Sequence, residues 1–145
     1  MRALFVDTSG WMALEDAADA EHDVAVAARD EWLEGGGFLL LTDYVVDETL
    51  TLLRMRLGLP AAEHWWEKIA TSSRLSWEWI DPARAERARD WFFSWKDKGF
   101  SFTDCTSFVV MKEKRLKRAL STDRHFEQAG FEVVPAIKTP ARRRR

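Results

Sequence analysis

Ala3-Leu4-Phe5-Val6, followed at once by Asp7-Thr8-Ser9-Gly10, is the stretch that decides the fold. Four apolar residues without alternation are typical of a strand that is buried on both faces, as in a parallel sheet. The polar residues after them predict a turn and a helix that begins near Ser9. A carboxylate that closes such a strand lies at the edge where α/β proteins place their sites. Asp7 is therefore the first candidate functional residue, although capping the helix explains it equally well.

Short apolar runs and helical stretches continue to alternate along the chain. Further strands are predicted at residues 38–41, 75–80, 119–122 and 131–134. Helices are predicted at residues 19–34, 61–72, 103–114 and 123–129. Two more are predicted, one that begins after Asp43 as its N-cap and one from Asp81-Pro82 to about Lys96. Because hairpin turn motifs are missing, this order predicts an α/β fold with a parallel sheet covered on both faces.

Composition narrows the class of protein. The 145 residues carry 22 basic and 24 acidic side chains, so the net charge of −2 excludes a generally basic nucleic-acid binder. The single cysteine excludes an internal disulfide, and no apolar run approaches the ~20 residues that span a bilayer. Without a recognisable signal peptide, we expect a cytoplasmic protein with no membrane partner. We expect one domain over residues 1–135 and a basic, disordered tail over 136–145.

Three further acids occupy strand ends or first helical turns. Asp123 follows a predicted strand as Asp7 does, and capping is again an equal explanation. For Asp104, taken alone, a capping box with Ser101 is the favoured explanation. For Glu48, taken alone, a solvated helix surface is favoured. Four carboxylates together, however, are the ligand type for Mg²⁺, which would support metal-assisted attack of water on a phosphodiester.

Other site types fit the sequence less well. A phosphatase of the haloacid-dehalogenase type needs a second aspartate where Ser9 stands. The histidines at 22, 64 and 125, with one cysteine, lack zinc-ligand spacing. Glycine-rich phosphate loops are absent from the sequence, and Gly35-Gly36-Gly37 predicts a helix end.

The motifs resemble, in order, those of PIN domains, and most of all those of VapC-type toxins of bacterial toxin–antitoxin systems. The resemblance covers residues 2 to 134 and rests on four segments: Phe5-Val6-Asp7-Thr8-Ser9, the helical acid Glu48, Ser101-Phe102-Thr103-Asp104-Cys105-Thr106-Ser107-Phe108, and Ser121-Thr122-Asp123-Arg124-His125-Phe126. The four acids are separated by 41, 56 and 19 positions.

The resemblance implies a three-layer α/β/α sandwich with a five-stranded parallel sheet. It also implies an Mg²⁺- or Mn²⁺-dependent endoribonuclease, a cognate antitoxin that blocks the pocket, and a homodimer. The family's acidic positions correspond here to Asp7, Glu48, Asp104 and Asp123, and its hydroxyl positions to Thr122 and Ser9. Because Asp47 is adjacent to Glu48, a shift by one residue stays open.

Positive charge near the acids would help to bind RNA. Arg124 and His125 directly follow Asp123, and Lys112 and Arg115 belong to a basic stretch, although either pair is also explained as solvated surface. The many tryptophans are interpreted as core or interface rather than as base-stacking platforms. Two alternatives remain: a catalytically idle PIN-like module that binds RNA or protein, and a general PIN nuclease outside a toxin–antitoxin system.

Overall fold

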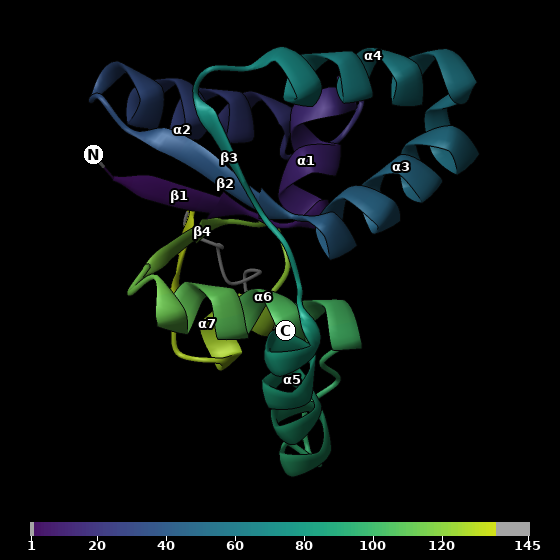
Figure 1. The fold of residues 1–145 in the computed structure, drawn as a ribbon. Helices are drawn as coiled ribbons and strands as arrows, with labels where there is room; N and C mark the ends of the chain where they lie inside the picture. The colour runs from purple at the N-terminus through teal and green to yellow at the C-terminus, as the bar shows by residue number, and fades with distance from the viewer. Residues whose placement is uncertain (1, 136–145) are drawn as a thin grey trace, which may run out of the picture.

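The structure, a computed structural model, describes residues 2–135 (Figure 1). Its strands are β1 (Ala3–Val6), β2 (Phe38–Thr42), β3 (Leu75–Glu78), β4 (Arg118–Leu120) and β5 (Glu132–Val134). The helices are α1 (Thr8–Glu15), α2 (His22–Glu34), α3 (Asp43–Leu57), α4 (Leu59–Thr71), α5 (Pro82–Ser94), α6 (Phe102–Glu113) and α7 (His125–Gln128). All strand pairs are parallel, in the order β3-β2-β1-β4-β5. The predicted α/β fold with a parallel, five-stranded sheet is confirmed.

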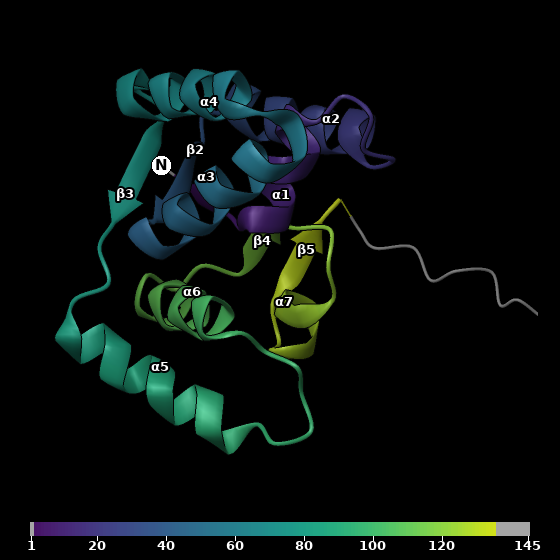
Figure 2. The same ribbon diagram turned by 90° about the vertical axis from the view of Figure 1, so that its right-hand side faces the viewer.

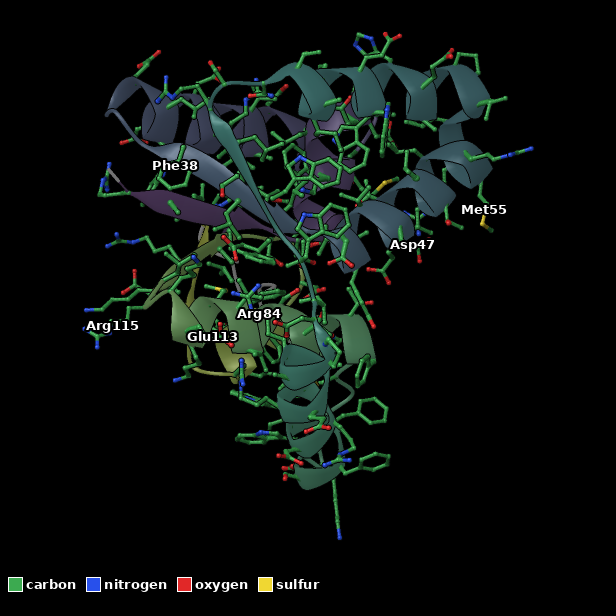
Figure 3. The ribbon with its side chains drawn as sticks, in the orientation of Figure 1. Phe38, Asp47, Met55, Arg84, Glu113 and Arg115 are labelled. Atoms are coloured by element: carbon green, nitrogen blue, oxygen red, sulfur yellow. The ribbon has the colours of Figure 1, made fainter. Side chains whose placement is uncertain are left out.

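Helices cover both faces of the sheet, which gives the predicted three layers. Helices α1 to α4 lie on one face, and α6 and α7 lie on the other (Figures 1 and 2). Helix α5 lies farthest from the sheet and packs against α6 (Figure 2). The Arg84 guanidinium fixes α5, since its Nη2 lies 3.1 Å from Glu78 Oε1 and 3.0 Å from Glu113 Oε1 (Figure 3).

The apolar runs form the core because β1 lies in the middle of the sheet and is covered on both faces. Leu4, Phe5 and Val6 are fully buried. On one face, the Trp11 ring meets the Trp65 ring edge-on at 5.4 Å. On the other, the Phe5 ring lies 5.9 Å from that of Phe126. Packing of this kind positions the carboxyl ends of β1 and β4 without any disulfide.

Register brings together the residues that follow β1 and β4. Val6 pairs with Leu120, so Asp7 and Ser121 are the next residues on neighbouring strands. The Asp7 amide donates to the Leu120 carbonyl at 3.3 Å, which continues the pairing by one step. Two polar residues are therefore adjacent at the carboxyl edge of the sheet, where the sequence predicted a site.

Two predicted helix starts are wrong. Asp43 is not the N-cap of α3: Thr42 Oγ1 accepts from the Val45 amide at 3.2 Å. The Asp43 carboxylate instead accepts from the Ile80 amide at 2.8 Å and fixes the end of β3. Helix α7 begins at His125 rather than at residue 123, because the Asp123 carboxylate accepts from the His125 amide at 2.8 Å and holds a turn there.

Smaller corrections concern which side chains are buried. In α2 the buried residue is Ala25, whereas Val24, expected on the apolar face, is 47% exposed. The tryptophans were expected in the core or at an interface: Trp65 lies in the core, whereas Trp66 and Trp79 are 45% and 62% exposed, and for these two an interface stays a prediction. No helix within residues 2–135 is both long and apolar enough to cross a membrane. The predicted tail at 136–145 lies outside the described residues.

Gly10 permits α1 to approach β4 closely, and this predicts an unusual response to alanine. A Cβ at Gly10 would lie 3.0 Å from the Leu120 carbonyl carbon and 2.8 Å from its Cδ2. Glycine to alanine in a helix ordinarily stabilises by up to about 1 kcal/mol. Here we expect Gly10→Ala to lower the free energy of unfolding by about 1–3 kcal/mol, measured by urea denaturation, because the added methyl overpacks the contact.

Gly99→Ala is the matched control, because a Cβ there meets no heavy atom within 4 Å and should change stability by less than about 0.5 kcal/mol. A Gly10→Ala protein as stable as Gly99→Ala would show that α1 and β4 are not in tight contact.

Candidate active site

One pocket opens at the carboxyl ends of β1, β2 and β4, and all four candidate acids line it. They are Asp7, Glu48, Asp104 and Asp123. The two predicted hydroxyl residues, Ser9 and Thr122, line it as well. These side chains come from the starts of α1 and α6, from α3, and from the turn after β4. The fold therefore brings together residues that are more than 100 positions apart in the sequence.

Asp7 is both the helix cap and the innermost acid of the pocket. Its Oδ1 accepts from the Gly10 amide and from Ser9 Oγ, each at 2.8 Å. Its Oδ2 accepts from Ser121 Oγ at 2.8 Å. Burial, followed by the neighbouring Asp123 carboxylate, raises the pKa of Asp7 from 3.8 to about 7, and the hydrogen bonds only partly oppose this shift. Capping and a site role are thus compatible, because the cap leaves a buried carboxylate at the pocket.

Asp104 combines the same two roles at the start of α6. It forms the predicted capping box: Ser101 Oγ accepts from the Asp104 amide at 2.9 Å, and Asp104 Oδ2 accepts from the Ser101 amide at 3.0 Å. His125 Nδ1 lies 2.7 Å from the same Oδ2. Burial is the main reason that the pKa of Asp104 is raised above its ordinary value. The backbone of α6 and the ring of His125 therefore orient one carboxylate together.

Glu48, rather than its neighbour Asp47, faces the pocket. Thr8 Oγ1 donates to Glu48 Oε1 at 2.5 Å, which links α1 to α3. Asp47 is exposed on the outer side of α3 (Figure 3). The sequence left open whether Asp47 or Glu48 is the site residue. The structure places Glu48, and not Asp47, beside the other acids.

Comparison with known proteins identifies the family of this chain. The family model for the PIN domain matches residues 4–132. The chain belongs to the PIN-domain family. A 23S rRNA-specific endonuclease, VapC20 of Mycobacterium tuberculosis, is 36% identical over 137 residues, which cover 91% of this chain and 98% of the relative. A VapC ribonuclease of Archaeoglobus fulgidus is 34% identical and covers 86% of this chain and 79% of its own length.

Solved structures agree with this assignment. The crystal structure of Mycobacterium tuberculosis VapC20, described as a sarcin-ricin loop cleaving toxin, has a TM-score of 0.81 at 34% identity and covers 88% of this chain and 95% of its own. FitAcB of Neisseria gonorrhoeae has a TM-score of 0.61 at 18% identity, over 90% and 95% of the two chains, and shows a likeness of fold. This PIN domain is therefore a homologue of VapC ribonuclease toxins.

The carboxylates of this PIN domain share a pattern of hydrogen bonding. In three of the acids, one oxygen accepts from protein donors. Glu48 accepts from Thr8, and Asp104 accepts from Ser101 and from the His125 ring. Asp123 accepts from the His125 amide. Their second oxygens, Oε2, Oδ1 and Oδ2, have no hydrogen-bond partner within residues 2–135. Held on one side and free on the other, such carboxylates are suited to coordinate a cation from the pocket.

The donor set fits a hard divalent cation more than zinc. Its oxygens are carboxylates and hydroxyls, which suit Mg²⁺ or Mn²⁺. No three Asp, Glu, His or Cys side chains of the described segment converge closely enough to form a metal-holding group. Mg²⁺ does not require such a closed cage, because it keeps several waters and binds through one or two carboxylates.

Several pocket residues were missed by sequence reasoning. Thr8, which donates to Glu48, lines the pocket together with Arg56, Asp19 and Met12, and Ser121 lies behind it, fully buried, and donates to Asp7. Ser121 could have been found from its position beside Asp123 at a strand end. Arg56 lies eight residues after Glu48, which places both on one side of α3. For Thr8, a local sequence pattern offers no comparable indication, because its partner is 40 positions away.

The predicted basic residues lie at different places. His125 lines the pocket, but Arg124 does not and pairs with Glu127 at 3.4 Å. Lys112 lies in the last turn of α6, at the end opposite Asp104, and Arg115 lies two residues beyond the helix, at the edge of the molecule (Figure 3). Lys112 Nζ lies 5.5 Å from the centroid of the Phe131 ring. Contact of these four residues with RNA stays a prediction.

Cys105, next to Asp104, is not an activated nucleophile. Its side chain is fully buried. Burial, and then the Asp104 carboxylate, raise the pKa of its thiol to about 11, so the thiol remains protonated at neutral pH. The interpretation of Cys105 as a small buried residue is therefore consistent with the structure.

The raised pKa of Asp7 predicts how the metal-free protein responds to pH. Between pH 4 and 7 the folded state holds a proton on Asp7 that the unfolded state has released, so stability falls as pH rises. From about 1.4 kcal/mol per pH unit, we expect the free energy of unfolding to fall by roughly 2.5 kcal/mol between pH 5 and pH 8. Urea denaturation in EDTA at pH 5 and pH 8 measures it.

The Asp7→Asn variant should lose most of this pH dependence and be more stable than wild type at pH 8, since its side chain carries no charge. The amide oxygen can still accept from the Gly10 amide and Ser9 Oγ. The amide NH2 can donate to Ser121 Oγ in place of the bond that Ser121 donates to Asp7. Parallel stability profiles of the two proteins from pH 4 to 8 would contradict the account of Asp7.

Proposed function

We propose that this protein is a metal-dependent endoribonuclease that hydrolyses RNA phosphodiester bonds, with Mg²⁺ or Mn²⁺ as its cofactor. The observation that carries the proposal is the meeting of Asp7, Glu48, Asp104 and Asp123 in one pocket. Homology to ribonucleases over nine-tenths of the chain supports it, at 36% identity over 91% of the sequence. An acidic pocket would repel RNA by itself, so a bound cation is required to offset the phosphate charge.

Each acid has a proposed role that follows from its contacts. Asp7 and Asp104, the two acids whose pKa values burial raises, gain most from a cation and would be its principal ligands. Glu48 and Asp123, each with one unengaged oxygen, would hold the cation's waters or a second ion. The bound ion supplies Lewis-acid polarisation of the phosphate and a water of lowered pKa. Ser9 and Thr122 would orient that water or the adjacent carboxylates.

The substrate and partners are proposed from the relatives. The name of the Mycobacterium tuberculosis relative makes 23S rRNA, and its sarcin-ricin loop in particular, the first substrate to test. We further propose that the protein is the toxin of a toxin–antitoxin pair, is held inactive by a cognate antitoxin over the acidic pocket, and acts as a homodimer.

Removal of the Asp104 charge should slow cleavage strongly. We expect purified wild-type protein to cut a short RNA hairpin of sarcin-ricin sequence with Mg²⁺ or Mn²⁺ and to be inactive in EDTA. Asp104→Asn should lower the cleavage rate about 100-fold or more, because even residues that only orient metal ligands contribute about 10- to 100-fold. Gel electrophoresis of end-labelled RNA measures the rate.

Asp47→Asn removes the same charge from the exposed side of α3 and should cleave like wild type. Wild-type protein that binds the RNA but cuts neither it nor total rRNA with either metal would favour the idle binding module.

Metal binding should also stabilise the fold. At 100 times the dissociation constant, a cation bound to the folded state alone adds about 2.7 kcal/mol, which corresponds to several degrees in Tm. We expect Mn²⁺ to raise the Tm of wild type and of Asp47→Asn by this amount, and that of Asp7→Asn much less. Equal shifts in wild type and Asp7→Asn would show that Asp7 does not hold the ion.

A further inference from the structure

His125 contacts two of the four pocket acids at once. Its ring Nδ1 lies 2.7 Å from Asp104 Oδ2, and its backbone amide donates to Asp123 Oδ1 at 2.8 Å. These contacts connect the start of α6 to the turn after β4, 21 positions away. Because Asp104 and Asp123 are like charges close enough to influence each other, they tend to separate unless something holds them. His125 is the residue that touches both.

The packing around His125 fixes where its ring can lie. The next residue, Phe126, is fully buried, and its ring packs against the rings of Phe108 at 5.0 Å and Phe5 at 5.9 Å. The His125 ring itself meets the edge of Phe100 at 5.7 Å. The His125 side chain is 34% exposed, so its ring is fixed by the anchored main chain on one side and by Phe100 and Asp104 on the other, which limits its rotamers.

The hydrogen bonds assign distinct tasks to the oxygens of Asp104. Oδ2 accepts from both the Ser101 amide and His125 Nδ1, which fills its acceptor capacity. Oδ1 has no partner among the described residues. Since a carboxylate only accepts, Nδ1 carries the proton in this contact and Nε2 is the other ring nitrogen. The contact therefore fixes the plane of the carboxylate and leaves Oδ1 for the pocket.

We propose that His125 is a positioning residue for the metal site: it orients Asp104 so that the free oxygen of that carboxylate binds the cation, rather than contacting RNA. The inference rests on the proposed function, since it concerns the cation that the four acids would hold. In many metal sites a metal-bound histidine donates its second N–H to a carboxylate or carbonyl, which orients the ring. Here the roles are reversed: the carboxylate of Asp104 would bind the metal, and His125 donates to it and orients it.

Substitution of the ring separates this role from others. The bond to Asp123 comes from the main chain, so it survives a change of side chain. A ring substitution removes the Asp104 contact together with the packing on Phe100, and the asparagine variant restores the first of these without the second. We expect His125→Ala to weaken Mn²⁺ binding about 10- to 100-fold, the usual effect of losing a residue that orients a ligand. His125→Asn places an amide N–H near the position of Nδ1 and should recover most of the affinity. Electron paramagnetic resonance of free Mn²⁺ measures both without RNA.

His64→Ala and His64→Asn are the matched controls, because His64 is exposed on α4 and lies outside the pocket; neither should change Mn²⁺ affinity. In the double variant Asp104→Asn with His125→Ala, we expect no loss of Mn²⁺ affinity beyond that of Asp104→Asn, because the histidine acts through the aspartate. The Tm of each variant in EDTA verifies folding.

The outcomes are distinct. Wild-type Mn²⁺ affinity in His125→Ala, or additive losses in the double variant, would overturn the inference while leaving the proposed nuclease intact. A His125→Ala protein with normal Mn²⁺ affinity but weakened binding of RNA in EDTA would show an RNA contact instead. If the wild type binds no Mn²⁺ and cuts no RNA, the proposed function fails and the inference with it.

Discussion

The buried carboxylate of Asp7 is the constraint on which the rest of the site depends. It ends the central strand, caps α1 through the Gly10 amide, and accepts from Ser121 on the neighbouring strand. These contacts are made only if α1 approaches β4 closely, which Gly10 permits. Burial disfavours the charged form of Asp7, so the ionised carboxylate lowers the stability of the folded protein. A bound cation would offset this destabilisation, so the buried carboxylate that lowers stability is also the one suited to bind the metal.

Helix caps and site residues are often treated as competing explanations, but here they coincide. Asp7 and Asp104 stand at the starts of α1 and α6, where unpaired backbone amides can stabilise a carboxylate. Such amides engage one side of each acid. The remaining oxygens, with those of Glu48 and Asp123, line a common pocket because the carboxyl ends of β1 and β4 are adjacent. Capping holds each carboxylate in one orientation, and the parallel sheet brings the carboxylates together.

The sequence predicted most of this arrangement for identifiable reasons. Uninterrupted apolar runs and the order of elements predicted the parallel sheet, and acids at strand ends predicted the pocket edge. What it missed depends on side-chain geometry. Asp43 was the predicted cap of α3, but Thr42 caps the helix, and only the position of the Ile80 amide shows why the Asp43 carboxylate is used elsewhere. The contacts of Thr8 with Glu48 and of His125 with Asp104 join distant segments, so local patterns could not reveal them.

A crystal structure of the protein grown with Mn²⁺, with anomalous diffraction measured at the manganese edge, would show whether the buried acids of the pocket hold a cation. We expect an anomalous peak in the pocket at direct-ligand distance from a carboxylate oxygen of Asp7 and from Asp104 Oδ1. A fully occupied peak elsewhere, or an empty pocket at saturating Mn²⁺ and neutral pH, would contradict this expectation.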